Sequence, residues 1–199
     1  MANMTTLAVS DDEYRDIIRT LERGYTSELK DRKGKTYYIC HRPNKRVAFA
    51  LRLEYATGLR ISDIVKLRQK DIVKDGDRYR LDVIEQKTKK KRTFRISQNI
   101  YDCIDSYCAE NKIPSDQPII GTTTYAIQKQ LKFVSDYLGL ERVSTHSLRK
   151  SASIAIYRKT GNDIVAVQDF LQHSSPMTSA RYINVRNPAL DNAIDSLSM

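Results

Sequence analysis

The sequence predicts an α+β domain that is mainly helical, with one small three-stranded antiparallel sheet. Two observations indicate this class. Apolar residues recur at helical spacing over most of the chain, and one stretch, residues 71–96, alternates instead with the period of two typical of strands. A chain of 199 residues can also bury a core without disulfide bonds or a structural metal. We therefore expect one helical domain built around a short sheet.

The first helix is expected to begin after Ser10, because Ser10 and Glu13 have the spacing of a capping box. It should end near Gly24. Residues 1–9 are expected to form a disordered lead. Residues 24–43 are polar, basic and rich in turn formers, and we interpret them as a loop.

The next segment predicts a buried central helix. Residues 44–57 are apolar on most faces, and Gly58 is placed to end the helix. A short helix is expected over residues 62–67. The Asp-Gly-Asp break at residues 75–77 then indicates a hairpin.

Three antiparallel strands are expected at residues 71–74, 78–86 and 91–96. The turn between the last two, from Lys87 to Lys91, is almost wholly basic. Helical periodicity returns at residues 98–111, 124–138, 147–159, 163–171, 176–184 and, as a terminal amphipathic stripe, 187–199.

The charge balance points to a polyanionic partner. Lys and Arg number 34 against 24 Asp and Glu, which gives a net charge of +10, and nucleic acid is the usual partner of such a surplus. No stretch approaches the roughly 18 apolar residues of a membrane span, and the N-terminus does not have the pattern of a secretory signal.

The cysteines indicate a reducing compartment. There are three, without CxxC spacing, which argues against a disulfide framework and a zinc site. Cys103 and Cys108 fall on one apolar helical stripe, so we expect both to be buried, inert thiols. A cytoplasmic location follows from this interpretation.

Two stretches offer phosphate-binding groups. Arg60 lies at the mouth of a helix, where it could donate two hydrogen bonds to a phosphate or simply pair with Asp63. The basic turn around Lys87 could contact phosphate, and one of its lysines could donate a proton to a leaving alkoxide. A solvated basic turn or a short targeting-like run would produce the same pattern.

Two further stretches offer proton-transfer and nucleophilic groups. His146 and Arg149 are three residues apart, so they share a helix face; a capping His beside an exposed Arg is the alternative. Ser175 and Pro176 favour a helix start, with His173 in the preceding turn and Tyr182 about 9 Å along the axis. A buried tyrosine with a satisfied hydroxyl is the alternative there.

Taken together and in this order, these stretches resemble the catalytic domain of the tyrosine recombinases, which include phage integrases and Xer-type and transposon recombinases. The resemblance covers roughly residues 45–185. The matching residues are Arg60 in TGLRISD, Lys87 in QKTKKKR, His146 and Arg149 in HSLR, His173 in LQHSS, and Tyr182 in ARYI.

The resemblance implies a mechanism without metal, cofactor or ATP. Tyr182 would attack a phosphodiester of double-stranded DNA and form a 3′-phosphotyrosyl bond, with His146 as its base. Arg60, Arg149 and His173 would hold the phosphate, and Lys87 would protonate the leaving 5′ oxygen. Further DNA contacts are expected from Lys89, Lys90, Lys91, Arg92 and Lys150.

The chain departs from the family pattern in two places. Gln172 stands before His173 where the family commonly has Gly, which affects the shape of the loop rather than the chemistry. Most members also carry an N-terminal DNA-binding domain, and no such segment fits before residue 10. We expect residues 10–186 to form the catalytic domain and residues 187–199 a tail helix that packs either in cis or on a neighbour in a DNA-bound homotetramer.

Other functions are compatible with some of these features. A type IB topoisomerase uses nearly the same residues to relax supercoiled DNA, and a DNA-binding regulator could retain a relic site. An RNA-binding module would need an aromatic stacking platform that the sequence lacks. A site-specific recombinase, cytoplasmic and associated with the nucleoid, is the function that we expect.

Overall fold

The chain divides into two compact units, Met1–Ala152 and Ser153–Met199. The computed structural model describes residues 6–30, 33–84, 89 and 91–183, without the side chains of Arg92 and Phe94. The boundary between the units falls inside helix α6 (Thr145–Lys159), and each unit is described here by itself.

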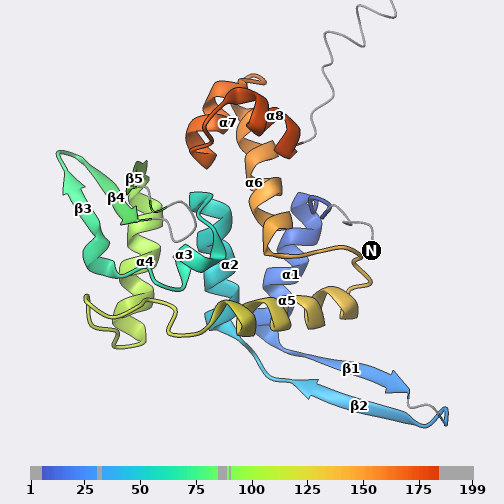
Figure 1. Cartoon of the computed structure of the whole chain (residues 1–199). Helices are drawn as coiled ribbons and strands as arrows, with labels where there is room; N and C mark the ends of the chain where they lie inside the picture. Colours follow the sequence, from blue (N-terminus) through green and yellow to red (C-terminus); the bar gives the residue numbers. More distant parts are fainter. Residues whose placement is uncertain (1–5, 31–32, 85–88, 90, 184–199) are drawn as a thin grey trace, which may run out of the picture. The chain divides into compact units, whose positions relative to one another are not determined.

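The first unit contains most of the helices and all of the strands among the described residues (Figure 1). Its elements before α6 are α1 (Asp11–Arg23), β1 (Tyr25–Lys30), β2 (Thr36–His41), α2 (Lys45–Thr57), α3 (Ile61–Ile64), the 3-10 helix η1 (Gln69–Asp71), β3 (Ile72–Asp75), β4 (Arg78–Ile84), β5 (Lys91–Ile96), α4 (Gln98–Glu110) and α5 (Thr124–Tyr137). The fold is thus mainly helical with small antiparallel sheets, as predicted.

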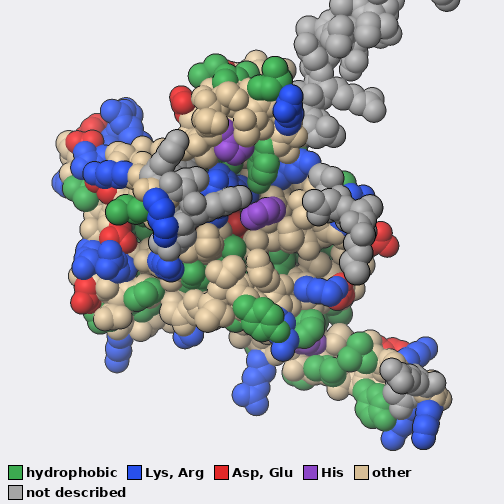
Figure 2. Space-filling model, in the orientation of Figure 1, with side chains coloured by type: hydrophobic (Ala, Val, Ile, Leu, Met, Phe, Trp, Pro, Cys, Tyr) green, Lys and Arg blue, Asp and Glu red, His purple; other side chains and the backbone are tan. Residues whose placement is uncertain are grey.

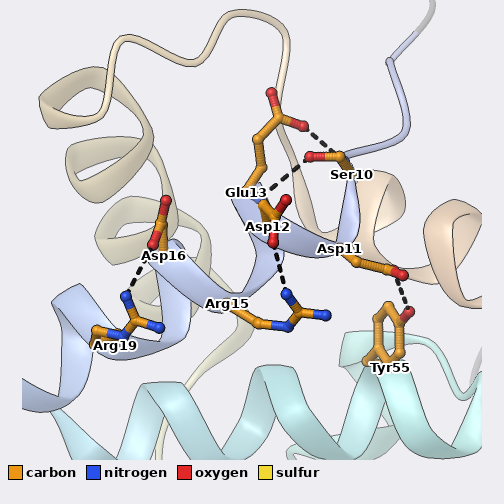
Figure 3. Close-up of polar contacts among 8 residues, drawn as sticks. All are labelled: Ser10, Asp11, Asp12, Glu13, Arg15, Asp16, Arg19 and Tyr55. Carbon is orange, nitrogen blue, oxygen red and sulfur yellow. Dashed lines mark hydrogen bonds and ion pairs between the residues drawn. The ribbon is translucent and has the colours of Figure 1, made fainter.

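Helix α1 begins as predicted, with a complete capping box (Figure 3). The Glu13 N–H donates to Ser10 Oγ at 3.2 Å, and the Ser10 N–H donates to the Glu13 carboxylate at 2.6 Å. Just before the helix, Val9 is buried, and its N–H donates to Ser151 Oγ on α6 at 2.8 Å. This contact joins the start of the described chain to α6.

Helix α2 is the centre of the main core, also as predicted. Asn44 caps its start by accepting the Val47 N–H, and Gly58 ends it in the left-handed conformation. Its apolar side chains pack with residues from α1, α4 and α5 in one buried cluster. Because α2 is covered on most sides, its last turn and the residues that follow are held in a rigid setting.

The three-stranded sheet has the order β3-β4-β5 and is antiparallel throughout. Its strands match the predicted positions within the described residues. The register places Ile72 opposite Leu81 and Tyr79 opposite Ile96. Tyr79 stacks on Tyr101 of α4, with ring centroids 3.7 Å apart, and this contact fixes the sheet to the helical core.

The loop predicted over residues 24–43 is wrong, because this segment forms a β-hairpin. Strands β1 and β2 pair antiparallel from Tyr25 opposite His41 to Lys30 opposite Thr36, so the fold has a second, two-stranded sheet. Both faces of the hairpin are largely exposed, which removes the apolar–polar alternation that marks a half-buried strand. At its base, Tyr25 stacks on His41 at 4.3 Å and contacts Tyr137 of α5 at 4.5 Å.

The prediction for the cysteines is half right. Cys108 is buried, but Cys103 is exposed. Helix α4 buries Ile104 and Cys108 toward the core, and Cys103 lies about 100° around the helix from Ile104, at the edge of the apolar stripe.

The second unit contains the rest of α6, followed by α7 (Ile164–Leu171) and α8 (Pro176–Ile183). These helices match the predicted segments to within about two residues. A small cluster of Val167, Leu171 and Ile183 forms its core. The terminal stripe predicted over residues 187–199 lies outside the described residues. Among the residues that the structure describes, no helix is long and apolar enough to cross a membrane.

Candidate active site

Arg60 stands at the turn between α2 and α3. Gly58 adopts a left-handed conformation (φ 60°), which reverses the chain, and Arg60 occupies the N-cap position of α3 with extended backbone angles. The Arg60 carbonyl accepts the N–H groups of Asp63 and Ile64 at 2.8 and 3.0 Å. The side chain of Arg60 is half-buried, so the turn positions a guanidinium partly shielded from solvent.

His146 and Arg149 lie in the first turns of α6, as the sequence predicts. His146 is exposed, whereas Arg149 is buried with only 3% of its surface accessible. The alternative interpretation of this stretch, a surface-exposed Arg, is therefore wrong. A guanidinium buried to this extent is placed for a specific anion rather than for solvent.

A buried carboxylate that the sequence analysis did not single out lies beside Arg149. Glu54, in the last turn of α2, is completely inaccessible to solvent. Burial raises the pKa of Glu54 well above its ordinary value, while the charge of the nearby Arg149 guanidinium and the approach of the Ile61 N–H lower it. Arg149 and the Ile61 N–H thus both lie near enough to this carboxyl to affect its pKa. The sequence did contain one sign of this carboxylate, because Glu54 is the single acidic residue within the apolar segment 44–57.

The basic turn is only partly described. Lys87 and Lys90 lie outside the described residues, so their predicted roles stay predictions. Lys89 is exposed and left-handed (φ 56°). Lys91 begins β5 and forms an ion pair with Asp82 at 3.7 Å. The strand places Arg92 opposite Val83.

An open pocket of about 700 Å³ is lined by residues of α3, η1 and strands β4 and β5. Asp63 and Lys66 line it on one side, and Ile84 and Lys91 line it on the other. Figure 2 shows Lys and Arg side chains gathered over this sheet and again at the end of the β1–β2 hairpin. Lys150, the last of the predicted DNA contacts, is half-buried on α6. Helix α3, which follows Arg60, therefore faces the sheet that carries the basic turn.

The second unit brings His173 and Tyr182 together. Helix α8 starts at Pro176, and Ser175 Oγ accepts the Thr178 N–H at 3.3 Å, as the sequence predicts. The rings of His173 and Tyr182 meet edge to face, with centroids 5.4 Å apart and planes 82° apart. His173 Nδ1 lies 3.1 Å from Ser179 Oγ, and Ser179 is fully buried. A half-buried phenol thus lies against an imidazole whose orientation is held by a buried hydroxyl.

The loop before His173 explains the departure at Gln172. Helix α7 ends with Gln172 in the left-handed conformation (φ 49°, ψ 47°), the conformation that glycine adopts without strain. The Gln168 amide donates to the His173 carbonyl at 3.2 Å and holds the turn closed. The residue at position 172 therefore sets the backbone conformation of the turn that precedes His173.

The first unit thus carries Arg60, His146 and Arg149, and the second carries His173 beside Tyr182, in a mainly helical fold. Residues 11–188 match the phage integrase family, so the chain belongs to that family. Its members are tyrosine recombinases, a class of enzymes that carry out site-specific recombination. The resemblance identified from the sequence is confirmed.

Curated relatives agree with this assignment. The chain is 34% identical over 176 residues to the probable integrase/recombinase YoeC of Bacillus subtilis, covering 84% of this chain and 88% of that protein. It is 31% identical over 150 residues to the tyrosine recombinase XerD of Lacticaseibacillus casei, covering 69% of this chain and 50% of XerD. The chain thus spans about half the length of the Xer relative.

Solved structures share the fold at lower identity. The XerH recombinase bound to its difH substrate superimposes with a TM-score of 0.65 at 20% identity, covering 98% of this chain and 56% of XerH. The lambda integrase catalytic core gives a TM-score of 0.58 at 19% identity, covering 85% of this chain and 92% of that core. These likenesses confirm the predicted fold class.

Proposed function

We propose that this chain is the catalytic part of a site-specific DNA recombinase that cleaves and rejoins double-stranded DNA through Tyr182. The observation that carries the proposal is the edge-to-face contact of Tyr182 with His173, which Ser179 orients. The buried Arg149 and the half-buried Arg60 supply the phosphate-binding groups that a phenol nucleophile needs.

The reaction follows from the chemistry of these groups. Tyr182 Oη bonds to the scissile phosphorus while the bond from phosphorus to the 5′ oxygen breaks. The phenol has an ordinary pKa of about 10, so it gives its proton to a base, for which His146 is our candidate. Lys87 gives a proton to the departing 5′ oxygen. The products are a 3′-phosphotyrosyl bond and a free 5′ hydroxyl, and the reverse steps rejoin the strand without ATP.

The arginines act on the charge that grows on the phosphate. Two guanidinium groups, from Arg60 and Arg149, would each donate hydrogen bonds to the non-bridging oxygens, and His173 would donate another. The exposed Lys89 and Lys91 and the half-buried Lys150, with Lys90 and Arg92, would contact neighbouring phosphates. Such contacts make binding fall steeply as salt rises.

Covalent trapping tests the proposal. On a nicked duplex that loses its 5′-hydroxyl strand after cleavage, the wild-type protein should accumulate a covalent protein–DNA adduct. Tyr182→Phe should bind the same DNA and form none. Tyr157→Phe, at another half-buried tyrosine of the same unit, is the matched control and should react normally. An adduct that survives Tyr182→Phe would overturn the assignment.

Two further assays, strand exchange and plasmid relaxation, separate the competing function. A recombinase exchanges strands between two duplexes, whereas a type IB topoisomerase relaxes a supercoiled plasmid without exchange. We expect strand exchange between duplexes that carry the cognate site. Relaxation without any exchange product would favour the topoisomerase.

We also propose that residues 10–186 act as the catalytic domain and that residues 187–199 pack on a neighbouring protomer in a DNA-bound homotetramer. Activity on chromosomal or mobile DNA would place the enzyme in the cytoplasm with the nucleoid. Analytical ultracentrifugation with DNA should detect a tetramer for the full chain and a smaller assembly for a 1–186 truncation. An unchanged assembly would assign the tail to packing in cis.

A further inference from the structure

Residues 7–9, which precede α1 and are called the strap below, lie against the first turns of α6. The Leu7 N–H donates to the Arg142 carbonyl at 3.4 Å, just before α6 begins. The Val9 N–H donates to Ser151 Oγ at 2.8 Å, and Ser151 Oγ donates to the Val9 carbonyl at 2.7 Å. Both partners belong to the first unit, although 142 residues separate them in sequence.

One hydroxyl bonds to both backbone polar groups of Val9. A serine hydroxyl has one proton and two lone pairs, so Ser151 Oγ can accept the Val9 N–H and share its proton between two carbonyls. The second carbonyl is that of Ser147, at 2.9 Å, one turn earlier on α6. Val9, Ser147 and Ser151 are all buried, so water has little access to these bonds. Loss of the hydroxyl would leave two buried backbone groups without this partner, and the strap would no longer be held to α6.

The strap contacts the side of α6 that lies away from the candidate site residues. Successive residues of an α-helix are about 100° apart, so Ser151 lies about 160° around the axis from Arg149 and about 140° from His146. Bonds on the Ser151 side can therefore fix the rotation of the helix without touching the groups that would meet DNA.

The rotation of α6 matters for both of these groups. Side chains extend about 5–6 Å from a helix axis, so a rotation of about 10° moves their ends by roughly 1 Å. A displacement of about 1 Å can slow a reaction about 100-fold. Among the described residues, no single helix or strand packs against α6 as closely as α1 packs against α2. Directional hydrogen bonds from the strap are therefore well suited to fix the rotation of α6.

We propose that Ser151 is a positioning residue, through which the strap fixes the rotation of α6 and so places His146 and Arg149 at the scissile phosphate. This inference rests on the proposed function, in which His146 takes the proton of the phenol and Arg149 binds a non-bridging oxygen. Both steps depend on orientation in the transition state, whereas many phosphate contacts share the binding of DNA. Loss of the strap should therefore lower the reaction rate far more than the affinity for DNA.

The variants Ser151→Ala and Ser151→Thr test the hydroxyl. Ala removes it, whereas Thr keeps it and adds a methyl group. In single-turnover adduct formation on the nicked duplex, Ala should lower the rate roughly 10- to 100-fold, and Thr should stay within about threefold of wild type. The dissociation constant for DNA should change less than about threefold in both variants. An Ala variant as fast as wild type, or a Thr variant as slow as Ala, would overturn the inference.

Val47→Ala is the control for stability alone. Val47 is buried in the first turn of α2, at the opposite end of that helix from Arg60, and has no part in the strap. Its truncation should destabilise the fold by leaving a cavity. With each protein assayed well below its unfolding temperature, Val47→Ala should react at the wild-type rate. A comparable loss of rate in Val47→Ala and Ser151→Ala would show that the rate follows general stability, which would contradict the role of Ser151.

A double-mutant cycle tests whether Ser151 acts through the strap. Val9→Pro removes the N–H that donates to Ser151 Oγ, so it should also lower the rate of adduct formation. In the Val9→Pro background, Ser151→Ala should lower the rate by less than about threefold, because the bond between the two residues is already lost. An equal loss in both backgrounds would show that the hydroxyl acts without the strap and would overturn the inference. Adduct formation by the wild type, absent in Tyr182→Phe, shows separately that the proposed function holds.

Discussion

The imidazole of His173 meets the phenol ring of Tyr182 edge to face, at a centroid distance of 5.4 Å. The contact joins the turn after α7 to helix α8, and those two helices pack tightly within the second unit. A nucleophile held in this way has little freedom to rotate, which reduces the entropy that must be lost before attack.

The hydroxyl of Ser179 is expected to set the orientation of His173. Because Ser179 Oγ lies 3.1 Å from His173 Nδ1 and is buried, Ser179→Ala should release the ring and lower the rate of adduct formation roughly tenfold, since a small misplacement of a catalytic group slows the reaction strongly. Ser174→Ala, at an exposed position of the same turn, should leave the rate unchanged. Equal rates for both variants would contradict the role of Ser179.

Replacing Gln172 by glycine should stabilise the turn before His173. Gln172 has φ 49°, and a side chain in this region costs about 1 kcal/mol relative to glycine. Gln172→Gly should therefore slow amide hydrogen exchange at the end of α7. Gln172→Ala keeps the Cβ atom and should give no such gain. Protection that rises equally in both variants would mean that the effect comes from loss of the rest of the Gln side chain and not from relief of backbone strain.

Gly24 should tolerate no side chain. At φ 75° and ψ 167° its backbone is in a region that is almost exclusive to glycine, and an added Cβ would lie 2.6 Å from the His41 carbonyl oxygen. Gly24→Ala should lower the free energy of unfolding by about 2–4 kcal/mol in urea titrations. Gly34→Ala at the hairpin turn has a similar φ of 80° but meets no atom within 4 Å, so it should cost less. An equal loss of unfolding free energy in the two variants would mean that the backbone near His41 shifts and relieves the clash.

The buried carboxyl of Glu54 should make the stability depend on pH. Its pKa is raised by burial, although Arg149 and the Ile61 N–H oppose the rise, so the folded protein binds this proton more tightly than the unfolded chain. The protonated carboxyl therefore makes its full contribution to the free energy of unfolding below the unfolded pKa of about 4.5. This contribution is lost as pH rises through the folded pKa. Glu54→Gln should remove this loss.

Urea titrations at several pH values above 4.5 check this prediction. The stability difference between Glu54→Gln and wild type should grow with pH, whereas Glu22→Gln should follow the wild-type curve. Parallel curves for Glu54→Gln and wild type would show that Glu54 does not titrate differently on folding.

Local signals in the sequence were sufficient for most of the fold. The capping box at Ser10 and Glu13, Gly58 at the end of α2, and Ser175 before Pro176 all act within one helical turn, so helix boundaries could be predicted from neighbouring residues. The alternation in residues 71–96 likewise marked the sheet, because one of its faces packs on the core. The family followed from six residues in a specific order.

Only the tertiary structure could decide the rest. The β1–β2 hairpin depends on contacts of Tyr25 and His41 with α5, far along the chain, and its exposed faces have no apolar alternation to read. Glu54 and Arg149 lie on different helices, and nothing in either local sequence shows that they share one buried environment. The sequence by itself determined the helices, the three-stranded sheet and the family, because those properties arise from short-range patterns. Which charges face each other was decided by packing between residues distant in sequence, and that packing places a carboxylate beside the arginine of the candidate site.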